Sequence, residues 1–114
     1  MDGGATRFTT RPGLRATILM DEEEQYQGRP LVSVLLDLAR DAGVRTAFVS
    51  KGVAGFGERR LVHTTAIEIL TFHLPLTVEC VDEVERVERL VGRLGAMAFG
   101  GLLDVQPTAL VVPE

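Results

Sequence analysis

The stretch LTVECVDEVERVERLVGRLG, residues 76–95, contains a strand signal followed directly by a helix signal. A short apolar run from Leu76 to Val81 predicts a buried strand. Asp82, with Glu85 three positions later, has the pattern of a capping box at a helix N-terminus. Apolar residues then recur every three or four positions until Gly95, where the helix is expected to end. The stretch therefore predicts a strand that leads into an amphipathic helix, with its charged residues on an exposed face linked by ion pairs.

The remaining elements are predicted on both sides of this stretch. Period-two alternation of apolar residues indicates strands, and apolar residues spaced by three and four indicate a helix that begins at a proline and ends at a glycine. These signals predict a strand over 14–20, a helix from Pro30 to Gly43, strands over 45–49 and 101–105, and a short last strand over 109–112 after Pro107.

The order strand, helix, strand, strand, helix, strand is that of an α+β, ferredoxin-like split βαβ fold (βαββαβ), with two helices on one face of an antiparallel sheet. Residues 1–13 show no periodicity and are expected to be a flexible N-terminal tail. Residues 14–114 are then long enough for one domain with a single core. Alternation along the strands predicts an apolar open face on the sheet and hence self-association.

Composition excludes several classes of function. The net charge of −4 argues against a general nucleic-acid binder, because such proteins carry a net basic face. The single Cys80 excludes an internal disulfide and, within an apolar segment, predicts a buried thiol in a reducing compartment. With no apolar run long enough to span a membrane and no signal-peptide core at the start, we expect a cytoplasmic protein.

A second stretch, KGVAGFGERRLVHT at residues 51–64, has the composition of a binding loop between two strands. Its glycines allow sharp turns and close approach of backbone N–H groups to an anion. Its arginines present planar donor groups that match phosphate or carboxylate oxygens, and its lysine adds a mobile charge. The alternative is a hairpin loop whose glycines serve only its turns. The candidate ligand-binding residues are Lys51, Gly55, Phe56, Gly57, Arg59, Arg60, His63 and Thr64.

The run Gly55-Phe-Gly57, the basic residues after it, His63-Thr64 and the later Leu74-Pro75 resemble the PII-like proteins, in particular their uncharacterised branch. The resemblance implies a homotrimer with clefts between subunits and a T-loop over residues 51–73. It matches the Gly55-Phe-Gly57 run to the base of that loop, and Arg59, Arg60, His63 and Thr64 to the basic stretch and the His-Thr that follow it. It also implies a regulatory protein, not an enzyme, that binds a small anion such as an adenine nucleotide, requires no cofactor, and acts on a membrane transporter or another regulated protein.

The chain departs from the PII pattern after its second helix. Residues 96–101 lack the lysine with which PII proteins help to hold phosphates, so a different nucleotide, another small anion or no ligand at all are the alternatives.

Two other classes of function compete with this hypothesis. His63, His73 and Cys80 are suitable metal ligands, as in the related divalent-cation tolerance trimers, but their spacing is not that of a structural site. An enzyme acting on a phosphorylated substrate would use His63 or Glu58 as a base. No residue is an evident nucleophile, since Ser50 and Thr64 have the character of ordinary strand and turn residues. We therefore assign no catalytic residue and no metal site.

Overall fold

The computed structural model describes residues 7–52, 54–55, 63–64 and 74–113. Within these residues the elements are β1 (Phe8–Asp21), β2 (Gln25–Tyr26), β3 (Arg29–Pro30), α1 (Leu31–Asp41), β4 (Ala47–Lys51), β5 (Ala54–Gly55), β6 (His63–Thr64), β7 (Pro75–Glu83), α3 (Val84–Ala96) and β8 (Leu102–Pro113).

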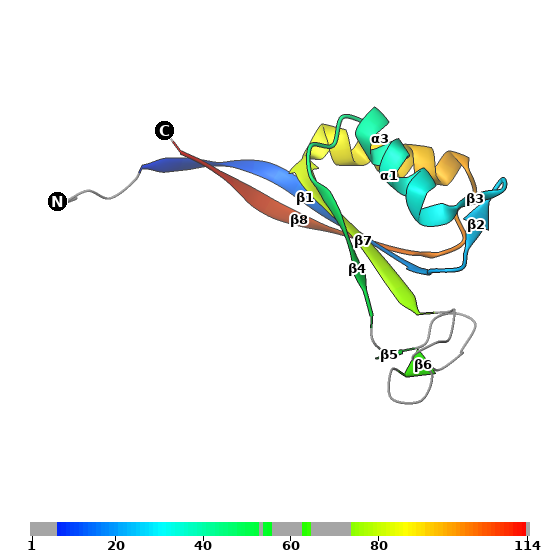
Figure 1. The fold of residues 1–114 in the computed structure, drawn as a ribbon. Coiled ribbons are helices and arrows are strands. Elements are labelled where there is room, and N and C mark those ends of the chain that lie inside the picture. Colours follow the sequence, from blue (N-terminus) through cyan, green and yellow to red (C-terminus); the bar gives the residue numbers. More distant parts are fainter. Residues whose placement is uncertain (1–6, 53, 56–62, 65–73, 114) are drawn as a thin grey trace.

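The main sheet is antiparallel, with the strand order β4-β7-β1-β8, and both helices lie on one of its faces (Figure 1). Its four strands and two helices follow the order βαββαβ, which confirms the predicted ferredoxin-like α+β fold. β2 and β3 form a tight hairpin before α1, where Gln27 and Gly28 both have positive φ, as a type I′ turn requires.

The core lies between the helices and the central strands. Ile18 of β1 and Val78 of β7 face Leu35 of α1 and Leu90 of α3, and each is at most 1% exposed. The helical spacing of apolar residues puts one face of each helix into this layer. Cys80 is buried in the same layer as predicted, and burial raises the pKa of its thiol.

Two arginines of α3 join the helices instead of forming only surface ion pairs. Arg86 donates to the carbonyl of Gly43 at 2.7 Å, and Arg89 donates to the carbonyl of Ala42. These carbonyls follow the last turn of α1, where backbone acceptors lack helical partners and a cation is favourable. The predicted exposed face linked by ion pairs therefore also includes two arginines that bind the end of α1.

The first and last strands are longer than predicted. β1 begins at Phe8, so the predicted tail is wrong for residues 8–13, which pair with β8. β8 continues through Pro107 to Pro113, because an edge strand tolerates a residue without a backbone donor.

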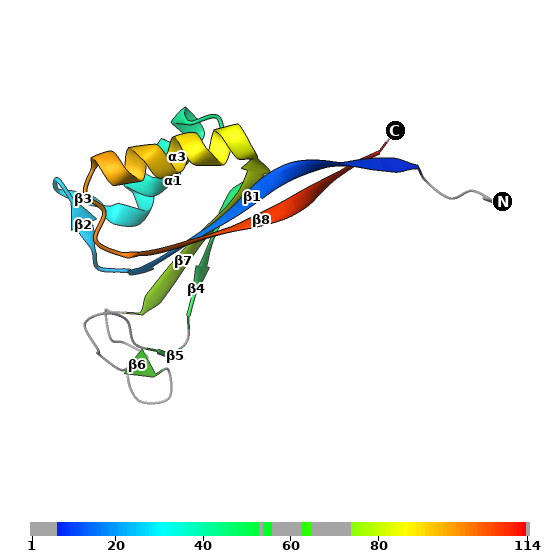
Figure 2. The same ribbon diagram turned by 180° about the vertical axis from the view of Figure 1, so that it is seen from behind.

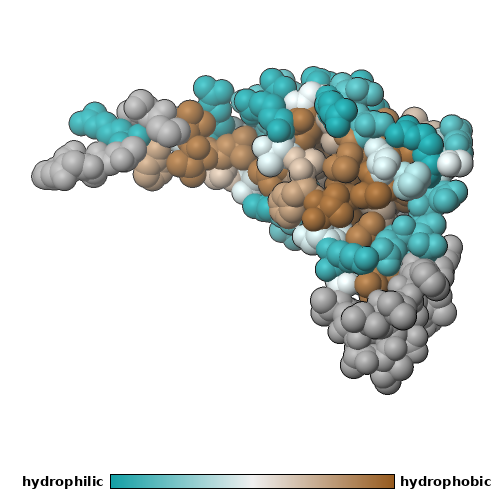
Figure 3. Space-filling view, viewed as in Figure 1, coloured by the Kyte–Doolittle hydropathy of each residue, from teal (hydrophilic) through white to brown (hydrophobic). Residues whose placement is uncertain are grey.

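The extra lengths of β1 and β8 form a two-stranded ribbon, which we call the distal arm: residues 8–12 paired with residues 109–113. β7 pairs with β1 only from Gly13 onward, so the sheet narrows to two strands at that residue. The arm points away from the helices in both views (Figures 1 and 2). Phe8 and Val111, 58% and 62% exposed, give it an apolar surface that is visible in Figure 3.

The open face of the sheet has a polar centre. The strand register puts an ion pair between Arg15 and Glu79 there, beside Thr17 and Thr77. The expectation of an apolar open face is therefore wrong for its centre. Exposed apolar side chains on this face lie to either side of the centre: Leu19, Phe48 and Leu102.

Gly13 marks a close crossing of strands and generates a stability prediction. A Cβ at this residue would lie 2.9 Å from the carbonyl oxygen of Asp82 and 2.7 Å from Cγ of Leu110. We expect Gly13→Ala to lower the free energy of unfolding by about 1–3 kcal/mol, because the overpacked backbone must shift. The measurement is urea denaturation.

Gly92→Ala is the matched control. Gly92 lies within α3, and an added Cβ there meets nothing within 4 Å. The same substitution should therefore raise the free energy of unfolding by about 0.5–1 kcal/mol through helix propensity. Equal changes at the two positions would contradict the close crossing.

Candidate functional site

The structure describes part of the predicted binding loop. β4 and β7 are neighbours in the sheet, so the loop connects adjacent antiparallel strands as predicted. Inside it, Gly55 pairs with His63 and Ala54 pairs with Thr64, as the short strands β5 and β6. Four candidate ligand-binding residues lie outside the described residues: Phe56, Gly57, Arg59 and Arg60.

Glu22 joins the two ends of this loop. Its Oε2 atom pairs with Nζ of Lys51 at 2.9 Å, and its Oε1 atom accepts the N–H of Leu74 at 3.1 Å. Its own N–H donates to the carbonyl of Leu74 at 3.0 Å, and the N–H of Gly52 donates to the carbonyl of Pro75 at 2.8 Å. The hydrogen bond from Lys51 lowers the pKa of Glu22. These contacts join Lys51 and Gly52 to Leu74 and Pro75, at a place that we call the loop root. Lys51, predicted as a ligand-binding charge, is therefore already paired at the loop root.

The loop root yields a test by hydrogen exchange. In Glu22→Ala, the amide of the buried Leu74 loses its side-chain acceptor, and we expect its exchange to accelerate about tenfold, as for the loss of one charge-assisted hydrogen bond. Glu23→Ala, an exposed neighbour, should leave this amide unchanged. Unchanged exchange in Glu22→Ala would show that the carboxylate does not hold the loop root.

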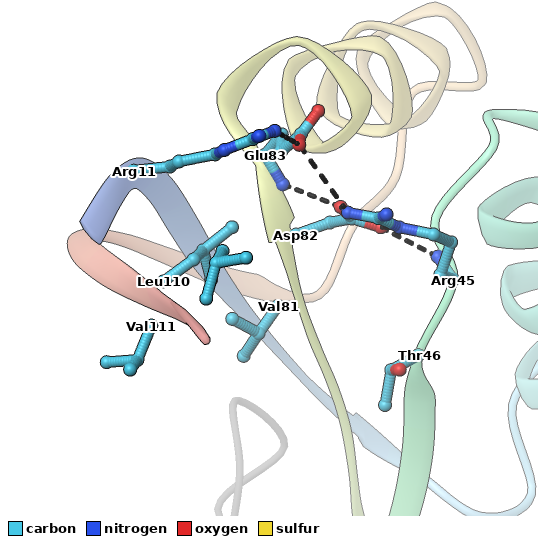
Figure 4. A pocket seen from close by; sticks show the side chains of 9 residues that line it. Arg11, Arg45, Thr46, Val81, Asp82, Glu83, Leu110 and Val111 are labelled. Atoms are coloured by element: carbon cyan, nitrogen blue, oxygen red, sulfur yellow. Dashed lines mark hydrogen bonds and ion pairs between the residues drawn. The ribbon is translucent and has the colours of Figure 1, made fainter. Parts of the chain in front are cut away.

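A pocket of about 450 Å³ lies at the other end of β4, at the base of the distal arm (Figure 4). It is lined by residues 45–46 ahead of β4, residues 81–83 at the end of β7, residues 110–112 of β8, and Arg11 of β1. Four segments that are distant in sequence therefore converge on it. They do so because the start of β4, the end of β7 and the arm meet at one end of the sheet.

Asp82 is the buried centre of this site, with 2% of its surface exposed. Its carboxylate accepts the N–H of Arg45 at 2.8 Å, Nη2 of Arg45 at 2.6 Å, and the N–H of Glu83 at 2.7 Å. Burial alone would raise the pKa of Asp82, but the hydrogen bonds and charge of Arg45 outweigh it and lower this pKa to about 2. Asp82 is thus a charged anchor for the segment that leads into β4.

The predicted capping role of Asp82 is wrong. α3 begins at Val84, its N-cap position is Glu83, and no side chain caps it. Asp82 instead continues the buried alternation of β7 through Leu76, Val78 and Cys80. A carboxylate at the next position of that alternation is the sequence signal that identifies Asp82 as a buried charge in need of a cation.

Two arginines at the rim of the pocket have exposed side chains that can bind a ligand. The side chains of Arg11 and Arg45 are each 60% exposed, and both contact Glu83, at 3.3 Å and 3.7 Å. Beneath them, Val81 and Leu110 form an apolar wall (Figure 4). This arrangement suits a ligand with a flat apolar part and an anionic group, since a guanidinium binds phosphate or carboxylate through paired donors. No motif in the sequence pointed to Arg11 or Arg45.

The described residues give little support to the competing hypothesis of a metal site. Among them, no group of three or more His, Cys, Asp or Glu side chains could hold a metal ion. Cys80 faces the helices in the core, while His73 and the side chain of His63 lie outside the described part of the chain.

Within the described part of the chain, neither helix has the length and apolar character needed to cross a bilayer.

The ion pair of Asp82 predicts a pH-dependent contribution to stability. Its pKa is lowered on folding from 3.8 to about 2, so the unfolded chain takes up the proton first as pH falls. The pair therefore makes its full contribution to the free energy of unfolding above about pH 5. About 2 kcal/mol of that contribution is lost by about pH 2. The stability difference between wild type and Asp82→Asn, measured by urea denaturation, should shrink by that amount over this range. A difference that does not change with pH would contradict it.

A family model matches most of the chain. The family is DUF190, described as an uncharacterized ACR, and the match covers residues 13–110. The chain belongs to the DUF190 family. Two relatives are similar to most of the chain. A UPF0166 protein of Aquifex aeolicus is 31% identical over 94 residues, covering 82% of this chain and 89% of that protein. The UPF0166 protein MJ1524 of Methanocaldococcus jannaschii is 27% identical over 77 residues, covering 68% and 70%.

Solved structures with the same fold are PII-like. CPII from Thiomonas intermedia K12, in a structure bound to ADP and bicarbonate, superposes with a TM-score of 0.64 at 14% identity, covering 90% of this chain and 91% of CPII. A PII-like signaling protein from Thermus thermophilus superposes with a TM-score of 0.60 at 13% identity, with the same coverage. The predicted resemblance to the uncharacterised PII-like branch is confirmed, and with it the fold of this DUF190 protein.

Proposed function

We propose that this protein is a PII-like regulatory protein that binds an adenine nucleotide, or a similar small anion, at the pocket beside Arg45. The observation that carries the proposal is the pairing of two exposed arginines with an apolar wall. The PII-like fold supports it, because CPII structures of that fold are bound to ADP, AMP and bicarbonate.

The chemistry of the pocket matches the two parts of a nucleotide. A base offers a flat apolar face to Val81 and Leu110, and a phosphate accepts hydrogen bonds from the free N–H groups of Arg11 and Arg45. The volume of about 450 Å³ falls within the ordinary range for small-molecule sites. Glu83 lies between the arginines and disfavours a second negative charge at that point, which limits how deeply a polyphosphate enters.

The proposed output is the loop over residues 51–73, which acts on a partner protein such as a membrane transporter. Glu22 holds the root of this loop at one end of the β4–β7 pair, and the pocket lies at the other end of that pair. The proposal includes a cytoplasmic homotrimer in which each pocket forms one wall of a cleft between copies. It includes neither a catalytic step nor a required cofactor.

Titration calorimetry with ADP and AMP, with and without Mg²⁺, tests the proposal. We expect saturable binding to the wild type and an affinity about tenfold lower for Arg11→Met, the loss expected for one charged hydrogen bond. Arg11 is suitable because it is exposed and, among the described residues, its side chain forms one ion pair, at 3.3 Å with Glu83.

Arg40→Met is the matched control. Arg40 is 79% exposed on α1 and does not line the pocket, so its loss should leave the affinity unchanged. An equal loss in both variants would indicate a general charge effect. Saturable binding that only Arg59→Ala with Arg60→Ala weakens would place the ligand on the loop instead of in the pocket.

A further inference from the structure

Glu83, the last residue of β7, lies among arginines that come from three separate segments (Figure 4). Its Oε2 atom is 3.3 Å from Nη1 of Arg11 and 3.7 Å from Nη2 of Arg45. Its Oε1 atom is 3.9 Å from Nε of Arg86, in the first turn of α3. The carboxylate of Glu83 is therefore a negative charge of the protein itself at the place where an anionic ligand would meet the arginines.

Glu83 is held less tightly than its neighbour Asp82. Asp82 is buried and accepts Nη2 of Arg45 at 2.6 Å and the N–H of Arg45 at 2.8 Å. No described arginine comes closer to Glu83 than 3.3 Å, which is longer than the roughly 2.7–2.9 Å of a strong charged hydrogen bond. The side chain of Glu83 is also 29% exposed. Asp82 thus fixes Arg45 in place, whereas Glu83 mainly contributes its charge.

The ion pairs at this end of the sheet leave one positive charge uncompensated. They join three guanidinium groups, of Arg11, Arg45 and Arg86, to two carboxylates, of Asp82 and Glu83. Three positive and two negative charges leave a net charge of +1. One negative charge on a ligand is then neutralised, but a second would be partly removed from water beside Glu83 without a cation of its own, which is unfavourable.

We infer that Glu83 is a specificity-determining residue of the pocket, which favours a ligand phosphate with one negative charge over a phosphate with two. The matching class is a phosphate esterified on two sides, because a terminal phosphate carries nearly two negative charges at neutral pH. The inference rests on the proposed function, and it adds the charge that the ligand presents to Arg11 and Arg45.

Titration calorimetry with AMP and with the methyl ester of its phosphate tests this preference. The two ligands share their base and sugar, but at about pH 8 AMP carries two negative charges and the ester one. The Coulomb energy between Glu83 and the ligand is proportional to the charge of the ligand. We therefore expect Glu83→Gln to raise the affinity for both ligands, and the ratio of AMP affinity to ester affinity to rise about tenfold. The side chain of Glu83 does not cap α3, so the variant should keep the fold.

Glu88→Gln is the matched control. It removes the same charge from an exposed position of α3 that does not line the pocket, so screening should keep the change in this ratio below about twofold. An unchanged ratio in Glu83→Gln, or an equal change in both variants, would overturn the inference. Saturable binding with an unchanged ratio contradicts only the role of Glu83. Binding of neither ligand to any of the three proteins contradicts the proposed function, and the inference with it.

Discussion

The ion pair between Asp82 and Arg45 is the interaction on which the site depends. The alternation of β7 buries the side chain of Asp82 at the end of the strand, directly before α3. A buried carboxylate must be neutralised and hydrogen-bonded, and Arg45 supplies both a guanidinium and a backbone N–H. The pair therefore ties the segment leading into β4 to the end of β7, and the exposed remainder of the Arg45 side chain is held at the rim of the pocket.

The same pair of strands connects the two regions to which a function is proposed, the pocket and the loop. Five residues of β4 pair with β7 between the pocket end at Ala47 and the loop root at Lys51. At the root, Glu22 of the turn after β1 holds Lys51 and Leu74 together. The proposed input and output thus lie at opposite ends of one hydrogen-bonded ladder, on a fold that hosts many unrelated functions.

Local patterns in the sequence predicted the fold well, because alternation and helical spacing report directly on burial, as in β7 and α3. The errors arose where a distant partner decides the outcome. Residues 8–12 form a strand only because β8 extends alongside them, and Pro107 is tolerated because β8 is an edge. The pocket was missed because Arg45 and Asp82 are 37 residues apart, although the place of Asp82 in a buried alternation was a usable signal.

A crystal structure grown with ADP tests the central claim most directly. The account predicts a nucleotide between two copies, with its base against Val81 and Leu110, an anionic group within hydrogen-bonding distance of Arg45 or Arg11, and the Asp82 ion pair intact. An empty pocket with the nucleotide bound elsewhere on the chain would contradict the account. So would a nucleotide in the pocket that contacts neither arginine.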